Sequence, residues 1–246
     1  MNYNINFDNN RSLFKLDKKD QDFRIEKPKS AGNIKTPNQI FQENLRQEAL
    51  KKIDIIEKNH LFVVKQRNLN ETELAYIAGF LDGDGTIQIS TASTERQGGY
   101  VYPFKFQLNV AFIQLAKRQS FLIDLQQKFG NRGNIRKKTD TVSELVIGDI
   151  TIIKELLELL LPYLRTKKRQ AAIALLIIDH IQDPVNCNNL TCVEYLRRAK
   201  LVDELSFYND GRKRTNTSYV IKQKLISLNR LTQQDLQDSQ FIEINT

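Results

Sequence analysis

The stretch that decides the fold is Leu74–Gly85, which reads LAYIAGFLDGDG. Its small residues recur every three or four positions, at Ala75, Ala78, Gly79 and Gly83. Residues at this spacing share one face of a helix, and a face without bulky side chains lets a second helix backbone approach closely. A glycine often follows the last turn of a helix. The stretch therefore predicts a helix that ends at a glycine and has one nearly flat face.

This helix ends in two carboxylates, Asp82 and Asp84, each followed by a glycine. A carboxylate at a helix C-terminus opposes the helix dipole unless a cation balances it. Mg²⁺ and Ca²⁺ prefer oxygen ligands, so the pair indicates a divalent-cation site. The alternative is an ordinary turn, because Asp-Gly-Asp-Gly is also a common turn sequence. A calcium-binding EF-hand loop is excluded, because it requires glycine at its sixth position, where a loop counted from Asp82 has Ile87.

The sequence around this helix alternates between strand and helix patterns. Strands are predicted at 86–90 and 104–114, with Gly98 and Gly99 at the tip of the turn between them. The elements that follow are a helix at 117–129, a hairpin at about 134–147, helices at 150–161 and 165–181, and helices near 191–208 and 218–229. The order αββαββα predicts an α+β fold with antiparallel strands and C-terminal helices over residues 70–232, followed by a tail at 233–246.

The first 69 residues form an N-terminal extension. Residues 1–35 are polar and charged without a stable apolar period, which predicts disorder. Thr36 precedes Pro37 and Gln39 in the pattern of a helix start with a capping box. Apolar residues then recur at helical spacing and predict an amphipathic helix at 37–58. Its apolar face must pack on the main domain or on a partner.

The amino-acid composition excludes some classes of function and favours others. The 246 residues include 37 Lys and Arg against 29 Asp and Glu, for a formal net charge of +8. This surplus suits a polyanionic partner, because Lys and Arg displace counterions from phosphates, although a merely soluble basic protein has the same composition. No apolar run approaches the roughly 18 residues of a membrane span, so no membrane partner is expected. The first ten residues do not resemble a secretory signal.

The few sulfur and imidazole groups give little support to a metal site of their own. The chain has two cysteines and two histidines. Cys187 and Cys192 lack the second ligand pair of a zinc site, although His180 lies nearby, and they are interpreted as ordinary buried thiols. No phosphate-binding G-x-x-x-x-G-K-[ST] loop is present.

The stretch LAYIAGFLDGDG resembles the signature of the LAGLIDADG homing endonucleases. The chain carries one copy, as in the single-motif, homodimeric members encoded in organellar introns, and the resemblance runs from about residue 72 to 229. It implies the αββαββα fold with a saddle-shaped sheet. It also implies a homodimer in which two motif helices pack at the centre, with the interface residues Ala75, Ala78, Gly79 and Asp82.

The resemblance also implies the catalytic residues. Asp84 takes the acidic position and the Gly83 carbonyl lies beside it, so both would bind the metal, Mg²⁺ or alternatively Mn²⁺, in a two-metal phosphodiester cleavage. Asp82 is expected to cap a helix instead. Gln114 would lie near the scissile phosphate at the end of the second strand, and Arg118 would be the basic residue four positions on. Lys167 follows the loop between the two long helices and would stabilise phosphate charge.

Contacts to double-stranded DNA are predicted from strand geometry. Alternate residues of a strand face the same side, so polar side chains at alternate positions can line a surface that faces the major groove. The predicted set is Gln88, Ser90, Lys105 and Gln107 on the first hairpin, Arg136 and Lys138 on the second, and Arg212, Lys213 and Arg214 on a basic loop suited to phosphates. Each could instead be a solvated surface residue.

These inferences predict a homodimeric endonuclease that cuts both DNA strands at a long, pseudo-palindromic site and copies its intron into intronless alleles. The resemblance implies short 3′ overhangs and an organelle, the chloroplast before the mitochondrion. Two alternatives use the same fold, an intron-encoded maturase that binds intron RNA and a DNA-binding regulator. Asp84 and Lys167 are intact, which favours the nuclease.

Overall fold

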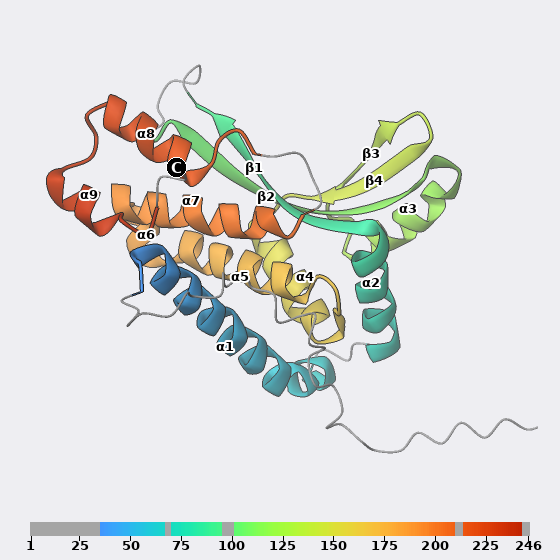
Figure 1. The fold of residues 1–246 in the computed structure, drawn as a ribbon. Coiled ribbons are helices and arrows are strands. Elements are labelled where there is room, and N and C mark those ends of the chain that lie inside the picture. The colour runs from blue at the N-terminus through green and yellow to red at the C-terminus, as the bar shows by residue number, and fades with distance from the viewer. Residues whose placement is uncertain (1–34, 67–69, 95–100, 210–213, 243–246) are drawn as a thin grey trace, which may run out of the picture. The chain divides into compact units, whose positions relative to one another are not determined.

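A computed structural model of the protein describes residues 35–66, 70–94, 101–209 and 214–242. The helices are α1 (Pro37–Gln66), α2 (Glu71–Asp84), α3 (Gln119–Lys128), α4 (Ile150–Leu160), α5 (Lys168–Gln182), α6 (Pro184–Asn188), α7 (Cys192–Phe207), α8 (Ser218–Ser227) and α9 (Gln233–Asp238). The strands are β1 (Gly85–Ser93), β2 (Phe104–Leu115), β3 (Asn134–Thr139) and β4 (Val142–Ile147). Two 3-10 turns, η2 (Ala116–Arg118) and η3 (Leu161–Tyr163), complete them. From α2 to α4 the order is the predicted αββαββα (Figure 1).

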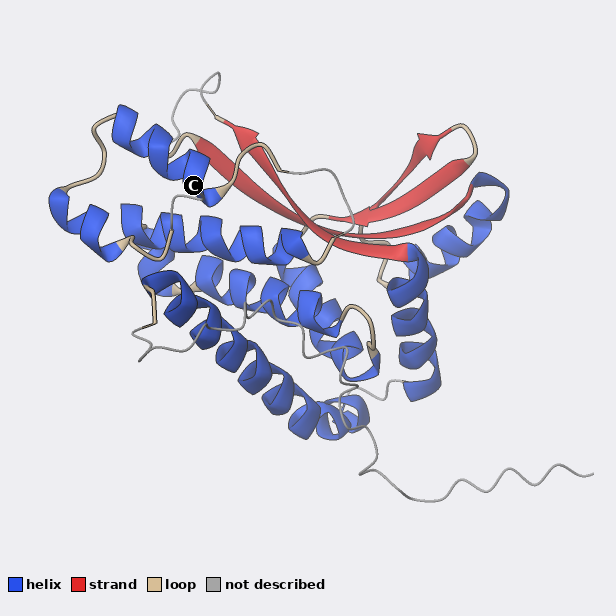
Figure 2. Cartoon of the chain, in the orientation of Figure 1, coloured by secondary structure: helices blue, strands red, loops and turns tan. Residues whose placement is uncertain are grey.

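One antiparallel sheet has the strand order β1-β2-β4-β3. Apolar and polar residues alternate along its strands, so its two faces differ. The apolar side chains, which are at most 8% exposed, are Ile87, Ile89, Leu108, Val110, Phe112, Leu145 and Ile147. The helices cover this face, whereas no helix of the described residues covers the opposite face, which curves like a saddle (Figure 2). We call it the uncovered face. The uncovered face is therefore available for a ligand.

Helix α2 leads directly into strand β1. The Asn70 side chain accepts hydrogen bonds from the backbone N–H groups of Thr72 and Glu73, at 2.9 and 3.3 Å, and so begins the helix. At the other end, a Cβ added at Gly85 would lie 2.5 Å from the Leu81 side chain. Only glycine fits this sharp step, so the last helical turn and its carboxylates lie at the start of the sheet.

The main core lies between the sheet and the helices beneath it. Ile153 and Leu157 of α4 and Ile173 and Ile177 of α5 are at most 1% exposed. The Asp149 side chain caps the first turn of α4. In the part of the chain that the structure describes, no helix has the length and apolar character needed to cross a membrane.

Helix α1 begins where predicted and continues to Gln66. The Thr36 hydroxyl accepts the Gln39 N–H at 3.3 Å, and the Gln39 side chain accepts the Thr36 N–H at 2.9 Å. Leu45 and Ala49 enter the main core, so the helix packs on the domain, and one compact unit runs from Thr36 onward. Residues 1–34, predicted to be disordered, and the predicted turn tip at Gly98 and Gly99 lie outside the described residues.

The C-terminal segment corrects the prediction of a tail after residue 232. The Thr232 hydroxyl and the Asp235 carboxylate form a capping box at the start of α9. Phe241 and Ile242 then pack into a second apolar cluster with Tyr195 and other residues of α7 and α8, and they are 8% and 4% exposed. The segment is therefore part of the folded unit.

Candidate functional site

The last turn of α2 presents one open carboxylate. Asp84 is exposed, and its side chain makes no hydrogen bond or ion pair with any described residue. A Cβ added at Gly83 would meet no atom within 4 Å, so the adjacent backbone is open too. An unpaired carboxylate at the negative end of a helix dipole is unfavourable, and a cation would relieve it. Asp84 and the Gly83 carbonyl therefore offer oxygen ligands of the kind that Mg²⁺ prefers.

The other carboxylate of this turn is fully engaged within the chain. Asp82 Oδ2 accepts the backbone N–H groups of Arg165 and Thr166, at 2.6 and 3.3 Å, and Asp82 Oδ1 accepts that of Lys167 at 2.9 Å. These N–H groups lie in the turn that leads into α5, so Asp82 caps this turn. Asp82 and Asp84 thus have different tasks although they are two residues apart.

Lys167 lies at the same junction. Its half-buried side chain donates a hydrogen bond to the Asp82 backbone carbonyl. This contact brings an ammonium group to the end of α2, beside the residues that carry the open carboxylate. A positive charge there can stabilise charge that develops on a phosphate group. The fold therefore joins the start of α5, which carries Lys167, to the last turn of α2, which carries Asp84, although these segments lie far apart in the chain.

The small-residue face of α2 is open over part of the predicted interface. A Cβ added at Gly79 or Gly83 would meet nothing within 4 Å, and Ala75 is exposed. The sequence predicts Ala78 on this face too, but Ala78 is 0% exposed in the chain's own core. Its position one residue before Gly79 turns it about 100° around the helix. The Asp82 carboxylate caps the turn before α5, as expected, and its place in the interface stays a prediction. We call Ala75, Gly79 and Gly83 the glycine face.

Gln114 and Arg118 lie where β2 leaves the sheet. Gly85 pairs with Phe112, so Gln114, two residues further along β2, lies beside the end of α2. The Gln114 side chain folds back onto the N–H of the next residue at 2.8 Å. Arg118 is exposed at the start of α3. Neither the Gln114 nor the Arg118 side chain forms a hydrogen bond with the carboxylates of α2 in the structure. The catalytic roles of these two residues therefore stay predictions.

The predicted DNA-contacting residues of the first hairpin share the uncovered face of the sheet. Ser90 lies opposite Gln107 in the register, and Gln88 and Lys105 lie at alternate positions on the same side. Gln88, Ser90 and Gln107 are exposed, and Lys105 is partly exposed. Their side chains offer hydrogen-bond donors and acceptors without an apolar patch, as base edges in a major groove require.

The second hairpin adds a charge cluster that includes an acidic residue absent from the sequence predictions. Arg136 Nε lies 2.8 Å and Lys138 Nζ 3.6 Å from the carboxylate of Glu144, which is 8% exposed at its side chain. Because Nε makes this contact, the terminal nitrogens of Arg136 are available to a ligand. The predicted hairpin contained a usable signal, since Arg136 pairs with Glu144 in its register.

The predicted phosphate contact of Arg214 is not supported by the structure. Its guanidinium forms an ion pair with Asp203 Oδ1 at 2.6 Å and donates to the Thr91 hydroxyl, and its side chain is 16% exposed. A buried guanidinium held by its own chain anchors this segment to β1, so it is not available to grip phosphates as the sequence predicts. Arg212 and Lys213 lie outside the described residues.

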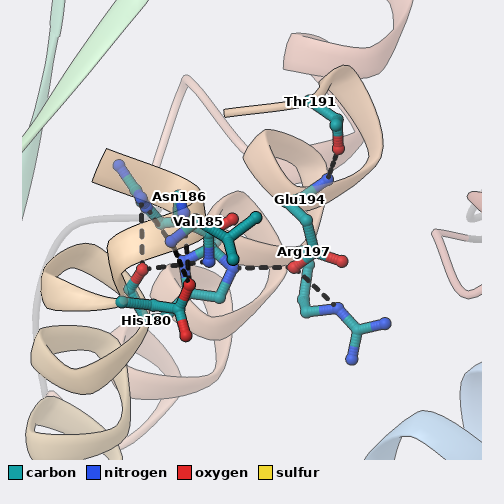
Figure 3. Close-up of polar contacts among 8 residues, drawn as sticks. His180, Val185, Asn186, Thr191, Glu194 and Arg197 are labelled. Atoms are coloured by element: carbon teal, nitrogen blue, oxygen red, sulfur yellow. Dashed lines mark hydrogen bonds and ion pairs between the residues drawn. The ribbon is translucent and has the colours of Figure 1, made fainter. Parts of the chain in front are cut away.

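His180 joins α5 to α7 (Figure 3). Its Nε2 lies 2.9 Å from Glu194 Oε2, and Arg198 Nε donates to its Nδ1 at 3.3 Å. Nδ1 is therefore the acceptor, and the proton is on Nε2. Burial is the main cause that lowers the His180 pKa, and the hydrogen bond to Glu194 opposes it. Both ring nitrogens thus serve the packing of these two helices.

The interpretation of Cys187 and Cys192 as buried thiols is wrong. Cys187 is exposed and Cys192 is partly exposed. The Cys187 thiol donates to the Ile181 carbonyl at 3.0 Å, and the Cys192 thiol donates to the Arg230 carbonyl at 3.3 Å. Both cysteines flank the loop between α6 and α7, where the backbone leaves the core.

Comparison with known proteins identifies the family of the chain. The sequence profile of the family described as LAGLIDADG endonuclease matches residues 77–178. The chain is 32% identical over 146 residues to the DNA endonuclease I-CvuI of Chlorella vulgaris, covering 59% of this chain and 85% of that protein. It is 30% identical over 161 residues to the DNA endonuclease I-CreI of Chlamydomonas reinhardtii, covering 65% of this chain and 92% of that protein.

Solved structures have the same fold. A crystal structure of I-CvuI with the I-CreI target in 2 mM Mg, in which the DNA is not cleaved, has a TM-score of 0.57 and 28% identity, covering 66% of this chain and 98% of that chain. A second I-CvuI structure holds its own target in 2 mM Ca. The profile match begins within α2 and ends within α5, so it contains both Asp84 and Lys167. The chain belongs to the LAGLIDADG endonuclease family.

Proposed function

We propose that this protein is a site-specific homing endonuclease that cuts both strands of a long, pseudo-palindromic DNA site and promotes the mobility of its intron. The observation that carries the proposal is the hydrogen bond of the Lys167 ammonium to the Asp82 carbonyl, in the same last turn of α2 that carries the exposed, unpaired carboxylate of Asp84. Family membership supplies the reaction class, and the junction supplies the groups that the reaction needs.

The proposed active form is a homodimer. One chain contributes a single open carboxylate at this junction, while cleavage of two strands needs one at each scissile phosphate. On the glycine face of α2, a Cβ added at Gly79 or Gly83 meets no atom of the described residues within 4 Å. A second α2 can therefore approach closely, which would bring two copies of Asp84 to the centre of the dimer. Two-fold symmetry of the protein would then match two DNA half-sites.

Asp84 and the Gly83 carbonyl would hold the divalent cation, which we propose to be Mg²⁺ with Mn²⁺ as a substitute. The cation, when bound, would activate water and stabilise the leaving oxygen. The chain's own residues arrange the rest. Asp82 fixes the turn before α5, and that turn holds the Lys167 ammonium where phosphate charge develops.

The uncovered face of the sheet would bind the DNA. Gln88, Ser90 and Gln107 would read base edges. Arg136, oriented by Glu144, would present its terminal nitrogens to a guanine, and Lys105 would add positive charge near the backbone. The two relatives come from the algae Chlorella vulgaris and Chlamydomonas reinhardtii, and we propose an organelle, the chloroplast, as the site of action.

The test is cleavage of a DNA library drawn from organellar ribosomal and photosystem genes, with Mg²⁺, with Mn²⁺, with Ca²⁺ and with EDTA. Metal-dependent cuts in both strands at one or a few sites would support the proposal. Tight, salt-sensitive DNA binding without cuts would support a regulator instead. Stronger binding to intron RNA than to DNA, again without cuts, would support a maturase.

A further inference from the structure

Helix α1 lies outside the region that the family profile matches. Two of its side chains, Glu57 and His60, contact residues on either side of the turn that carries Lys167. We infer that α1 braces this turn and that Glu57 and His60 are positioning residues for the Lys167 ammonium. The inference rests on the proposed role of Lys167 in cleavage. Four sets of contacts carry it.

The first contact lies before Lys167 in the chain. His60 is 7% exposed, and its Nε2 lies 2.9 Å from the Tyr163 hydroxyl. The two rings meet edge to face, with centroids 5.0 Å apart. The hydroxyl also donates to Glu71 Oε2 at 3.5 Å, so His60 is its donor and Tyr163 is held between α1 and the first residue of α2. The 3-10 turn η3 is thereby fixed at its last residue.

The second contact lies directly after Lys167. Glu57 Oε1 forms an ion pair with Lys168 Nζ at 2.8 Å, and the Lys168 side chain is 26% exposed. Lys168 is the first residue of α5. Glu57 therefore holds the residue next to Lys167 and fixes where the helix starts. Together with His60, it brackets the turn on both sides.

The third set of contacts fixes helix α1 on the domain. Asp179 of α5 accepts Lys52 of α1 at 2.7 Å and Lys154 of α4 at 2.8 Å, which ties three helices together. Leu45 and Ala49 of α1 are at most 6% exposed in the main core. Because α1 is anchored along its length, the contacts of Glu57 and His60 act from a rigid support and not from a loose helix.

The fourth set approaches from α2. The Asp82 carboxylate binds the three backbone N–H groups of residues 165–167. The turn is thus held from α2 on one side and from α1 on the other. Catalytic rate is sensitive to small displacements, since a shift of about 1 Å can cost roughly 100-fold. Loss of one brace contact should therefore lower the rate of cleavage without weakening DNA binding.

The experiment measures the single-turnover cleavage rate at saturating DNA, together with the DNA dissociation constant and the melting temperature. The variants are Glu57→Lys, Lys168→Glu and the double variant that exchanges the two charges. We expect a rate about 10-fold lower in Glu57→Lys with an unchanged dissociation constant, and recovery of the rate in the exchange variant. Tyr163→Phe, which removes the bond to His60 with little change in volume, should lower the rate in the same way.

The matched control is Asp54→Lys. Asp54 of the same helix pairs with Lys58 at 2.6 Å, and both side chains are exposed. The pair does not include a residue of the turn, so this charge reversal should leave the rate at the wild-type value. If the wild-type protein cuts DNA and Glu57→Lys cuts as fast as Asp54→Lys, the inferred role of α1 is wrong and the proposed function stands. Lower melting temperatures with normal rates would overturn the inferred role too, in favour of a purely structural one. A wild-type protein that cuts no DNA would overturn the proposed function first.

Discussion

Asp82 and Lys167 each bind the backbone of the other residue with their side chain. The Asp82 carboxylate accepts the Lys167 N–H at 2.9 Å, and the Lys167 ammonium donates to the Asp82 carbonyl. This reciprocal pair joins the end of α2 to the start of α5. It also leaves Asp84, two residues further on, as the carboxylate that can bind a cation.

The two aspartates should respond differently to truncation. Asp82→Ala leaves three backbone N–H groups without their acceptor, and we expect a loss of about 0.5–2 kcal/mol in the free energy of unfolding, as for the loss of a helix cap. Asp84→Ala removes an exposed, unpaired charge at a helix C-terminus and should cost nothing or stabilise slightly. Urea denaturation of both variants without metal measures the difference. Equal losses would contradict the separate tasks of the two residues.

The glycine face should decide the oligomeric state. Gly79→Leu adds a side chain where a Cβ meets no atom of the described residues within 4 Å. The isolated fold should therefore tolerate it, and circular dichroism measures this. The dimer should dissociate, because two α2 backbones could no longer approach closely. Light scattering would show a halved mass, while Gln47→Leu, on the exposed side of α1, would keep the wild-type mass. A dimer of Gly79→Leu would contradict this interface.

Arg136 and Lys105 should contribute to DNA binding in different ways. Arg136→Ala should relax the preference at one base pair by about 1–3 kcal/mol, because its terminal nitrogens are available for bidentate contact. Lys105→Ala should weaken all sequences evenly and lower the salt dependence of binding by about one counterion. Binding to single-substituted sites at several salt concentrations measures both effects. A uniform loss in Arg136→Ala would assign Arg136 to phosphate contact.

His180 should make the fold less stable in acid. Its pKa lies below the ordinary value of 6.5, chiefly through burial, with Glu194 raising it and Arg198 and Arg197 lowering it. The unfolded chain therefore takes up the proton first, so this stability is complete above pH 6.5 and is lost as the pH falls through the folded-state pKa. In His180→Gln the denaturation midpoint should change less between about pH 7.5 and about pH 5.5. An unchanged pH dependence would contradict this role.

Much of the fold could be predicted because local signals mark its elements. Thr36 caps α1 at the predicted position, Asn70 caps α2 where the main domain is predicted to begin, and apolar alternation marks the strands. The short helix α9 was not predicted, because Leu236 is its one apolar residue and gives no helical period, although Thr232 and Asp235 have the pattern of a capping box. The docking of α1 could not be predicted, because its apolar face fits the domain and a partner equally well from sequence alone.

The site was predictable only in part, since its long-range contacts leave no local signal. Asp84 and Lys167 followed from the family resemblance, and the structure joins their segments. The hydrogen bond of Arg214 to Thr91 and the bonds of Asp82 to residues 165–167 depend on distant chain segments that the fold brings together. Ala78 was misplaced because spacings of three and four both suit one helix face, although they diverge around it.

The central claim is that Asp84 at the end of α2 holds the cation for DNA cleavage, and Asp84→Asn tests it most directly. The change removes one negative charge and keeps the size of the side chain. Cleavage in Mg²⁺ by the wild-type protein and by Asp84→Asn would be measured together with DNA binding in Ca²⁺. The account predicts that Asp84→Asn binds the site and leaves both strands intact. Metal-dependent cleavage by Asp84→Asn at the wild-type rate would contradict it.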